Sequence, residues 1–240
     1  MSINTPKLAV DAVIFDLDGT LIDSAPIYYD IIDVIFEKLG IPPVSKRILS
    51  EAMKNGEFEW DFVLPDEMKN CKARVIETAR GIIDDIAPAM FRGQVKLIPG
   101  AADVLKAIAG RGLKLALVTS TLSDYMAIKL APMAQAGVEN LFEVVITADD
   151  VQNKKPHAEP LVMCSERLGL TPGNCVYVGD TRVDIKAGNE AGMQTVAVLT
   201  GFDEYDALAR EKPNAIIESV ADLESMLVIN ALTGSAARHH

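Results

Sequence analysis

The chain has 240 residues, of which 49% are hydrophobic and 24% charged, and its 34 acidic and 23 basic side chains give a formal charge of −11 at pH 7. An acidic chain without a basic cluster is unsuited to bind a nucleic-acid backbone, and no apolar run approaches the roughly 20 residues that a membrane helix needs. The cysteines have neither disulfide-framework nor zinc spacing, and the start of the chain lacks the features of a secretory signal, so we expect a cytoplasmic protein.

The first predicted element is a strand at residues 10–15, an apolar run that ends at two acidic residues, Asp16 and Asp18. A run of this length and composition is typical of a strand that is buried on both faces of a parallel sheet. Residues two apart on a strand face the same side, so the two carboxylates are expected to point roughly the same way if the strand geometry continues through them. Ligands of open α/β sheets bind beyond the carboxyl ends of the strands, which makes this edge a candidate site.

Residues 24–95 are predicted to be mainly helical. An amphipathic helix follows Ser24, a shorter helix begins at Ser45, and a long helix extends from about Pro65 to a stop near Pro88 and Gly93.

The rest of the chain alternates helical segments with short β-rich runs. Because parallel strands need crossover connections, this alternation predicts an α/β fold with a Rossmann-like parallel sheet core flanked by helices. The first strand has the same buried character, so we assign residues 1–23 and 96–230 to this core and 24–95 to an inserted all-helical cap. We interpret residues 231–240 as a disordered tail or an expression scar. The further strands are expected at residues 113–119, 144–147, 175–178, 195–199 and 215–217.

Polar side chains follow four of these predicted strands. Gathered at one edge of a sheet, they would place carboxylates, a hydroxyl and an amine around one crevice. A carboxylate that attacks a phosphate dianion from about 4 Å meets a repulsion of about 8 kcal/mol at an effective dielectric constant of about 20, so the reaction needs cations. Mg²⁺ and a fixed lysine would supply them. The polar groups are Asp16 with Asp18, Thr119 with Ser120, Lys154 with Lys155, and Asp180 with Asp184.

This set of motifs resembles the haloacid dehalogenase-like hydrolase superfamily, and more closely its phosphoglycolate-phosphatase-like members, which carry a helical cap after the first strand. The resemblance implies that Asp16 is the nucleophile that forms an aspartyl-phosphate and that Asp18 is the general acid and base. It also implies that Thr119 binds the phosphoryl group and that Lys155 offsets the charge of the nucleophile and the phosphate. Dehalogenating members carry an aromatic residue in place of Asp18, so this carboxylate favours phosphoryl chemistry.

The resemblance further implies a Mg²⁺ site. The ligands would be the Asp16 and Asp180 carboxylates and the main-chain carbonyl of Asp18, with Asp184 acting through a bound water. A calcium loop is a weaker interpretation of the first motif, because Thr20 and Leu21 stand where such a loop needs an oxygen ligand and a glycine. The residues expected to contact the substrate are Leu17, Gly19, Thr119, Ser120 and Lys155 in the core, and Arg47 and Lys54 in the cap.

The predicted function is a magnesium-dependent phosphatase that hydrolyses a small phosphorylated metabolite, similar to phosphoglycolate or to a sugar phosphate, through an aspartyl-phosphate. Neither a nucleic acid nor a membrane is expected as a partner. Three alternatives stay open: a sugar phosphomutase, a phosphonate hydrolase that would need a cap lysine such as Lys46 or Lys54, and a non-catalytic scaffold that binds phosphate or a partner. The sequence identifies neither the physiological substrate nor the oligomeric state.

Overall fold

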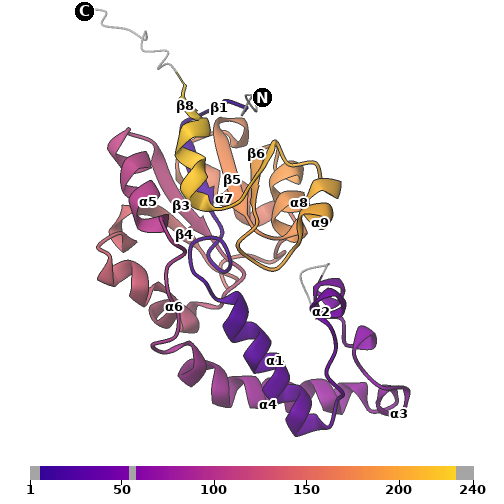
Figure 1. Cartoon of the computed structure of the whole chain (residues 1–240). Helices are drawn as coiled ribbons and strands as arrows, with labels where there is room; N and C mark the ends of the chain where they lie inside the picture. Colours follow the sequence, from indigo (N-terminus) through magenta and orange to yellow (C-terminus); the bar gives the residue numbers. More distant parts are fainter. Residues whose placement is uncertain (1–5, 54–57, 231–240) are drawn as a thin grey trace, which may run out of the picture.

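The protein is described by a computed structural model, which covers residues 6–53 and 58–230. Its central element is a parallel sheet with the strand order β4-β3-β2-β5-β6-β7 (Figure 1). β2 pairs with β3 on one side and with β5 on the other, so that Phe15 lies between Leu117 and Val178. The predicted α/β class is thereby confirmed. The strands are β2 (Ala12–Phe15), β3 (Lys114–Val118), β4 (Phe142–Ile146), β5 (Cys175–Gly179), β6 (Gln194–Val198) and β7 (Ala215–Ile217).

Different helices cover the two faces of the sheet, because alternate residues of each strand point to opposite sides. Val13 and Phe15 of β2 pack in one apolar cluster with Leu105, whereas Ile14 packs in a second cluster with Leu161. Each buried side chain of this size stabilises the fold by about 1.5–3 kcal/mol. The helices around the sheet are α5 (Ala101–Gly110), α6 (Ser123–Gln135), α7 (Glu159–Arg167), α8 (Arg182–Glu190) and α9 (Tyr205–Arg210).

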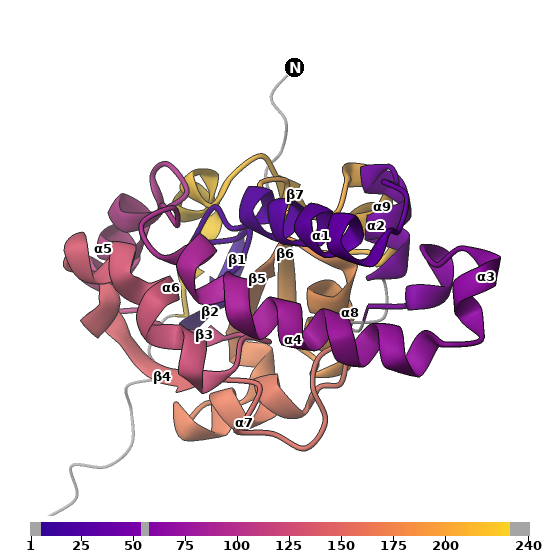
Figure 2. The ribbon, with the colours of Figure 1, turned by 90° about the horizontal axis from the view of Figure 1, so that it is seen from below.

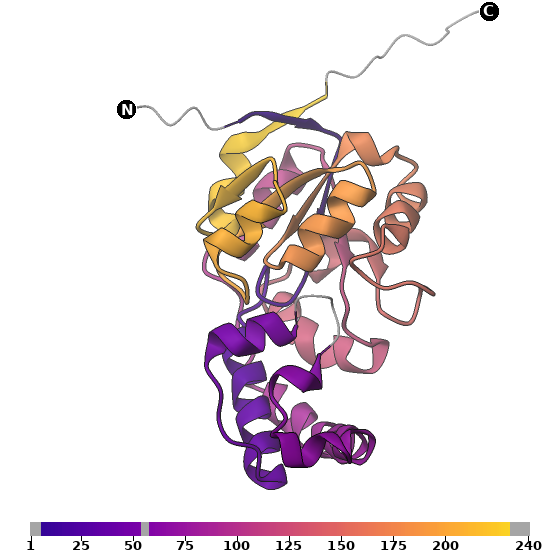
Figure 3. The same ribbon diagram turned by 90° about the vertical axis from the view of Figure 1, so that its right-hand side faces the viewer.

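A second group of helices stands beyond the carboxyl ends of the strands (Figures 1 and 3). Its two long members, α1 and α4, lie side by side across that end of the sheet (Figure 2). Ile27, Ile31 and Ile35 repeat every four residues on α1, so they share one face, and they pack in the same cluster as Val75 and Ala79 of α4. The helices of this group are α1 (Ala25–Leu39), α2 (Lys46–Ala52), α3 (Asp66–Lys69) and α4 (Lys72–Phe91).

The single long helix predicted from Pro65 to a stop near Pro88 and Gly93 is wrong in its continuity. Two helices, α3 and α4, take its place with Cys71 between them, and α4 continues past Pro88 to Phe91. A proline inside a helix removes one hydrogen bond to the carbonyl four residues earlier. Here that carbonyl belongs to the exposed residue Asp84, and only the last turn of the helix follows Pro88.

The strand predicted at residues 10–15 is also wrong, because it is divided at Asp11. The main-chain N–H of Asp11 donates to the carbonyl of Asn174 at 2.8 Å, and its carbonyl accepts from the N–H of Lys114 at 3.1 Å. The residues before Asp11 pair in parallel with a strand near the other end of the chain, which the sequence did not predict, in a separate two-stranded sheet. These strands are β1 (Leu8–Val10) and β8 (Leu227–Ile229).

Within the described residues, no helix is both long and apolar enough to cross a membrane. The division into a core of residues 1–23 and 96–230 and a cap of residues 24–95 stays a prediction. The interpretation of residues 231–240 falls on a segment outside the described residues.

Candidate active site

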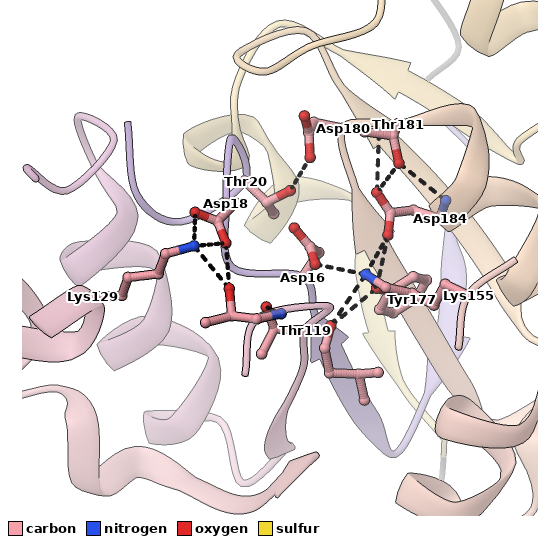
Figure 4. Close-up of polar contacts among 12 residues, drawn as sticks. Asp16, Asp18, Thr20, Thr119, Lys129, Lys155, Tyr177, Asp180, Thr181 and Asp184 are labelled. Atoms are coloured by element: carbon pink, nitrogen blue, oxygen red, sulfur yellow. Dashed lines mark hydrogen bonds and ion pairs between the residues drawn. The ribbon is translucent and has the colours of Figure 1, made fainter. Parts of the chain in front are cut away.

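Asp16 stands at the centre of the candidate site because β2 ends there (Figure 4). Its main-chain N–H donates to the carbonyl of Val178 at 2.8 Å, so the pairing of β2 with β5 extends up to the acid. The neighbouring strands end beside it, where β3 leads to Thr119 and β5 leads to Asp180. The carboxyl ends of three adjacent strands thus bring together side chains that lie far apart in the sequence.

Lys155 lies between two of the predicted acids. Its ammonium group is 2.7 Å from Asp16 Oδ1, 2.6 Å from Asp184 Oδ1 and 2.8 Å from the hydroxyl of Tyr177, and all four side chains are buried. Burial disfavours the charged lysine, but the two carboxylates outweigh it and hold the pKa of Lys155 well above its ordinary value. The lysine is therefore a fixed cation next to Asp16.

The buried carboxylates of Asp16, Asp180 and Asp184 form a cluster that could hold a divalent metal ion. One oxygen of each lies within 4.8 Å of the others. Burial raises the pKa of Asp16 to about 7 and that of Asp180 well above its ordinary range, and the neighbouring carboxylates add to both shifts while Lys155 opposes them. Three acids beside one lysine leave uncompensated negative charge, and an all-oxygen donor set is what hard divalent cations bind.

The main chain approaches Asp180 closely on one side. Gly19 has a φ of +77°, and a Cβ there would lie 2.5 Å from Asp180 Oδ2; a Cβ on Gly201 would lie 1.7 Å from the same atom. Glycine is the residue that tolerates such a conformation and such an approach. The N–H of Phe202 then donates to Asp180 Oδ2 at 2.8 Å, and the hydroxyl of Thr20 donates to Oδ1 at 3.2 Å.

Asp184 is held by the start of helix α8. Its Oδ2 accepts from the N–H of Thr181 at 3.1 Å and from the hydroxyl of the same residue at 2.5 Å, while the Thr181 hydroxyl accepts from the Asp184 N–H. This reciprocal capping box satisfies donors that the first turn of a helix leaves unpaired. Since Oδ1 faces Lys155, both oxygens of Asp184 already have protein partners.

The side chain of Asp18 points away from the acidic cluster, to the other side of Asp16 (Figure 4). Its oxygens accept from the ammonium of Lys129 at 2.8 and 2.7 Å, and Oδ2 also accepts from the hydroxyl of Thr121 at 2.8 Å. The chain leaves strand geometry directly after β2, so the condition under which Asp18 would follow the direction of Asp16 is not met. The Asp18 carboxylate is therefore not part of the acidic cluster that could hold a metal ion.

Lys129 is a buried lysine of α6 that the sequence analysis missed. Its side chain is 2% exposed, and its ammonium is 2.6 Å from the hydroxyl of Tyr28 and 4.9 Å from the ring centre of Phe91. The spacing of residues along this helix could have indicated that Lys129 is buried. Met126 and Met133 are buried on α6, and Lys129 lies at the spacing that places it on the same face.

Tyr177 is a second residue whose role the sequence left open. It lies within β5, where an apolar pattern predicts only core packing. Its hydroxyl nevertheless receives a hydrogen bond from Lys155 and lies 3.0 Å from Asp184 Oδ1 and 3.2 Å from the carbonyl of Val118. The tyrosine thus helps to fix the lysine from the sheet side.

The remaining core residues expected to contact a substrate differ in their access to the site. Thr119 and Ser120 line the cavity beside Asp16, and the hydroxyl of Thr119 accepts from the N–H of Thr121 at 3.1 Å. The side chain of Leu17 is fully buried in the core cluster, so only its main chain is available to a ligand. Gly19 has its carbonyl engaged by the hydroxyl of Thr200 at 2.6 Å.

The predicted cap contacts are not placed at the site by the described structure. Arg47 is exposed and is not among the residues that line the cavity. The ammonium of Lys46 lies 4.8 Å from the ring centre of Tyr29 instead. Lys54 lies outside the described residues. Trp60 does line the cavity, where it packs edge-to-face with Phe58.

Comparison with known proteins identifies the family of this chain. A family model described as haloacid dehalogenase-like hydrolase matches residues 13–198. The chain belongs to this family. The resemblance drawn from the motifs is confirmed, and the protein is an enzyme of the hydrolase class.

Among the relatives of this hydrolase is the phosphoglycolate phosphatase of Escherichia coli (strain K12), which is 32% identical over 233 residues, covering 89% of this chain and 91% of that protein. A solved structure of a predicted phosphoglycolate phosphatase from Haemophilus somnus 129PT superimposes with a TM-score of 0.77 at 23% identity, over 90% of this chain and 97% of that one. A Thermotoga maritima protein assigned as a β-phosphoglucomutase superimposes with a TM-score of 0.61 at 26% identity, over 90% of this chain and 97% of that one.

Proposed function

We propose that this hydrolase is a magnesium-dependent phosphatase that hydrolyses a small phosphomonoester through an aspartyl-phosphate. The observation that carries the proposal is the position of Asp16, with a buried lysine and an acidic cluster on one side and a second aspartate on the other. The names of its relatives support phosphatase chemistry. We place the reaction in the cytoplasm, with a small phosphorylated metabolite as the substrate.

In the first step, a carboxylate oxygen of Asp16 bonds to phosphorus while the bond from phosphorus to the leaving oxygen breaks. Asp18 gives a proton to that oxygen, so that an alcohol departs. Lys155, fixed 2.7 Å from Asp16 Oδ1, offsets the charge of the nucleophile and of the phosphoryl oxygens. Thr119 donates a hydrogen bond to the phosphoryl group. In the second step Asp18 takes a proton from the water that attacks the aspartyl-phosphate, which frees phosphate and restores Asp16.

Asp16 and Asp180 are the residues we propose to hold Mg²⁺, with the main-chain carbonyl of Asp18, and Asp184 through a water molecule. The three carboxylates lie within 4.8 Å of one another, which supports a shared role in holding one ion. When bound, the ion supplies positive charge that lowers the repulsion between the attacking carboxylate and the phosphate.

A sugar phosphomutase is the second candidate, favoured by the likeness to the Thermotoga maritima protein. It would use the same core residues and pass the phosphoryl group to another hydroxyl instead of to water.

The test is phosphate release by the purified protein from a panel of phosphomonoesters with and without Mg²⁺. We expect magnesium-dependent release of inorganic phosphate that Asp16→Asn abolishes. Turnover by that variant near the wild-type rate would contradict the nucleophile. An isomerised sugar phosphate without free phosphate would favour the mutase.

A further inference from the structure

The cavity above Asp16 is roomy, and its two sides differ in polarity. Its volume is about 760 Å³, which falls in the range of cavities that hold drug-sized ligands. Among the described residues, those that α1, α4 and the segment between α2 and α3 contribute to its wall are apolar or aromatic, apart from Arg80 and Asp84. Examples of this cap-side wall are Ile32, Phe58, Trp60, Ile76 and Ile83.

The two described lysines of the cavity are already engaged. An ammonium group has three donors, and those of Lys129 face Asp18, Thr121 and Tyr28. Those of Lys155 face Asp16, Asp184 and Tyr177 in the same manner. The acidic cluster and the two lysines thus contact one another and, under the proposed function, the reacting phosphate. The part of the substrate away from the phosphate would contact the cap-side wall.

Arg80 is the described cation that faces this space from the cap. It is exposed, and Asp84 lies one helical turn further along α4 with the opposite charge. Because Arg80 is exposed, water solvates its charge, and an ion pair with a substrate carboxylate there would add little to binding. A substrate with a carboxylate would therefore place that charge against apolar side chains, which is unfavourable without a partner.

Resting on the proposed function, we propose that the preferred substrates are phosphomonoesters whose alcohol carries an apolar aliphatic or aromatic body, and not phosphoglycolate. The phosphoryl group occupies the charged side of the cavity next to Asp16. The body of the alcohol lies against the cap-side wall, where each buried methylene group is favourable.

The test is a series of ethyl, propyl, butyl and hexyl phosphate, compared with 2-phosphoglycolate. The alcohols of this series have nearly equal basicity, so the bond-breaking step stays constant while the apolar area grows. We expect kcat/KM to rise up to about fourfold per methylene group, which corresponds to about 0.8 kcal/mol, and hexyl phosphate to exceed 2-phosphoglycolate at least tenfold. A flat series, or a preference for 2-phosphoglycolate, would overturn the inference and leave the phosphatase proposal intact. No phosphate release from any compound, p-nitrophenyl phosphate included, would overturn the phosphatase proposal itself.

Substitutions in the cap-side wall test whether the preference for longer alkyl chains depends on this surface. Ile83→Asn should lower the ratio of hexyl to ethyl phosphate kcat/KM at least fivefold, while the matched Ile83→Leu keeps it within twofold. Equal ratios in both variants would remove Ile83 from the wall. Arg80→Ala should leave the ratio unchanged. A loss of more than tenfold confined to 2-phosphoglycolate would identify Arg80 as a carboxylate receptor and overturn the inference.

A second and independent observation concerns the contact between Lys129 and Asp18. The lysine is buried, and its ammonium group donates to both carboxylate oxygens of Asp18. The same ammonium group lies 4.9 Å from the ring centres of Tyr28 and Phe91, which stand near the start of α1 and at the end of α4. Lys129 belongs to α6 of the core, and Tyr28 belongs to α1. One ammonium group thus joins Asp18 to both chain segments that lead into and out of the group α1–α4.

We infer that Lys129 is a positioning residue that orients Asp18 for proton transfer. Its replacement by Met removes the charge at similar volume. Because proton donation matters most when the leaving oxygen is basic, Lys129→Met should slow hexyl phosphate about 100-fold and p-nitrophenyl phosphate less than tenfold. Equal losses for both compounds would indicate a merely structural role and overturn the inference.

The double variant with Asp18→Asn keeps the test decisive. If Lys129 acts through Asp18, adding Lys129→Met to Asp18→Asn changes kcat/KM less than twofold, because neighbours that act together are not additive. A further loss equal to that of the single Lys129 variant would overturn the inference. The double variant also removes both charges, so neither is left unpaired, and its thermal midpoint checks that the chain folds.

Discussion

The core and the helices α1–α4 face the same cavity with opposite chemistry. On the core side lie buried charges in direct contact, such as Asp16 with Lys155 and Asp18 with Lys129. On the helical side lie apolar side chains such as Ile76 and Ile83. Under the proposed function, the charged groups would act on a phosphoryl group that all candidate substrates share, while the apolar surface would discriminate by the size and polarity of the alcohol. The comparison therefore separates the residues that determine the reaction from those that select the substrate.

The largest expected effect is on the core side. Asp16→Asn keeps the shape of the side chain but removes the nucleophile, so we expect kcat to fall by about 10³-fold or more for every substrate. Asp103→Asn, at an exposed position of α5, is the matched control and should retain wild-type activity. If the loss in Asp16→Asn differed between substrates, the separation of reaction residues from substrate-selecting residues would be contradicted.

A smaller effect is expected from the metal site. Asp180→Asn removes one proposed ligand, and we expect the Mg²⁺ concentration for half-maximal activity to rise at least about tenfold. A magnesium titration of the initial rate measures this. An unchanged titration curve would place the metal elsewhere.

The charge of the acidic cluster also predicts how stability depends on pH. Without metal, burial raises the pKa of Asp16 to about 7, above its value in the unfolded chain, so the folded protein holds a proton that the unfolded chain releases. The contribution of Asp16 to the free energy of unfolding is thus largest at low pH and is lost as the pH rises towards 7.

Mg²⁺ should therefore raise the thermal midpoint more at pH 8 than at pH 5, where protons compete with the ion. Thermal unfolding in Mg²⁺ and in EDTA at both pH values measures the difference. An equal or larger gain at pH 5 would contradict the assignment of Asp16 as a metal ligand.

The smallest effect is expected where the two regions are joined. Arg182 of α8 forms an ion pair with Asp203 at 2.9 Å, and the hydroxyl of Ser50 on α2 contacts both residues, at 2.9 Å from the guanidinium and 2.7 Å from Asp203 Oδ1. Ser50→Ala removes hydrogen bonds worth about 1 kcal/mol, so we expect KM to rise about fivefold with kcat nearly unchanged. Thr78→Ala, at an exposed position of α4 where the hydroxyl bonds within its own helix, is the control. A loss in kcat alone would mean that this link does not contribute to substrate binding.

Much of the core was predictable because its signals are local. The apolar runs that became β3, β5 and β6 carry their own evidence of burial, and the polar residues that follow them, from Thr119 to Asp180, are placed by the strand ends alone. The division at Asp11 was missed because it depends on hydrogen bonds to Asn174 and Lys114, which no local pattern encodes.

The sequence by itself determined that polar residues follow the strands at their carboxyl ends. This placement brings together Asp16, Lys155, Asp180 and Asp184. Only the tertiary structure decided which way Asp18 turns and what meets it. Helical periodicity shows that Lys129 faces inward, but not that it faces Asp18, because that contact depends on how α6 packs against the end of β2. The same limit applies to the cap-side wall, since apolar residues that pack a helix and apolar residues that line a cavity have the same pattern until the packing places them.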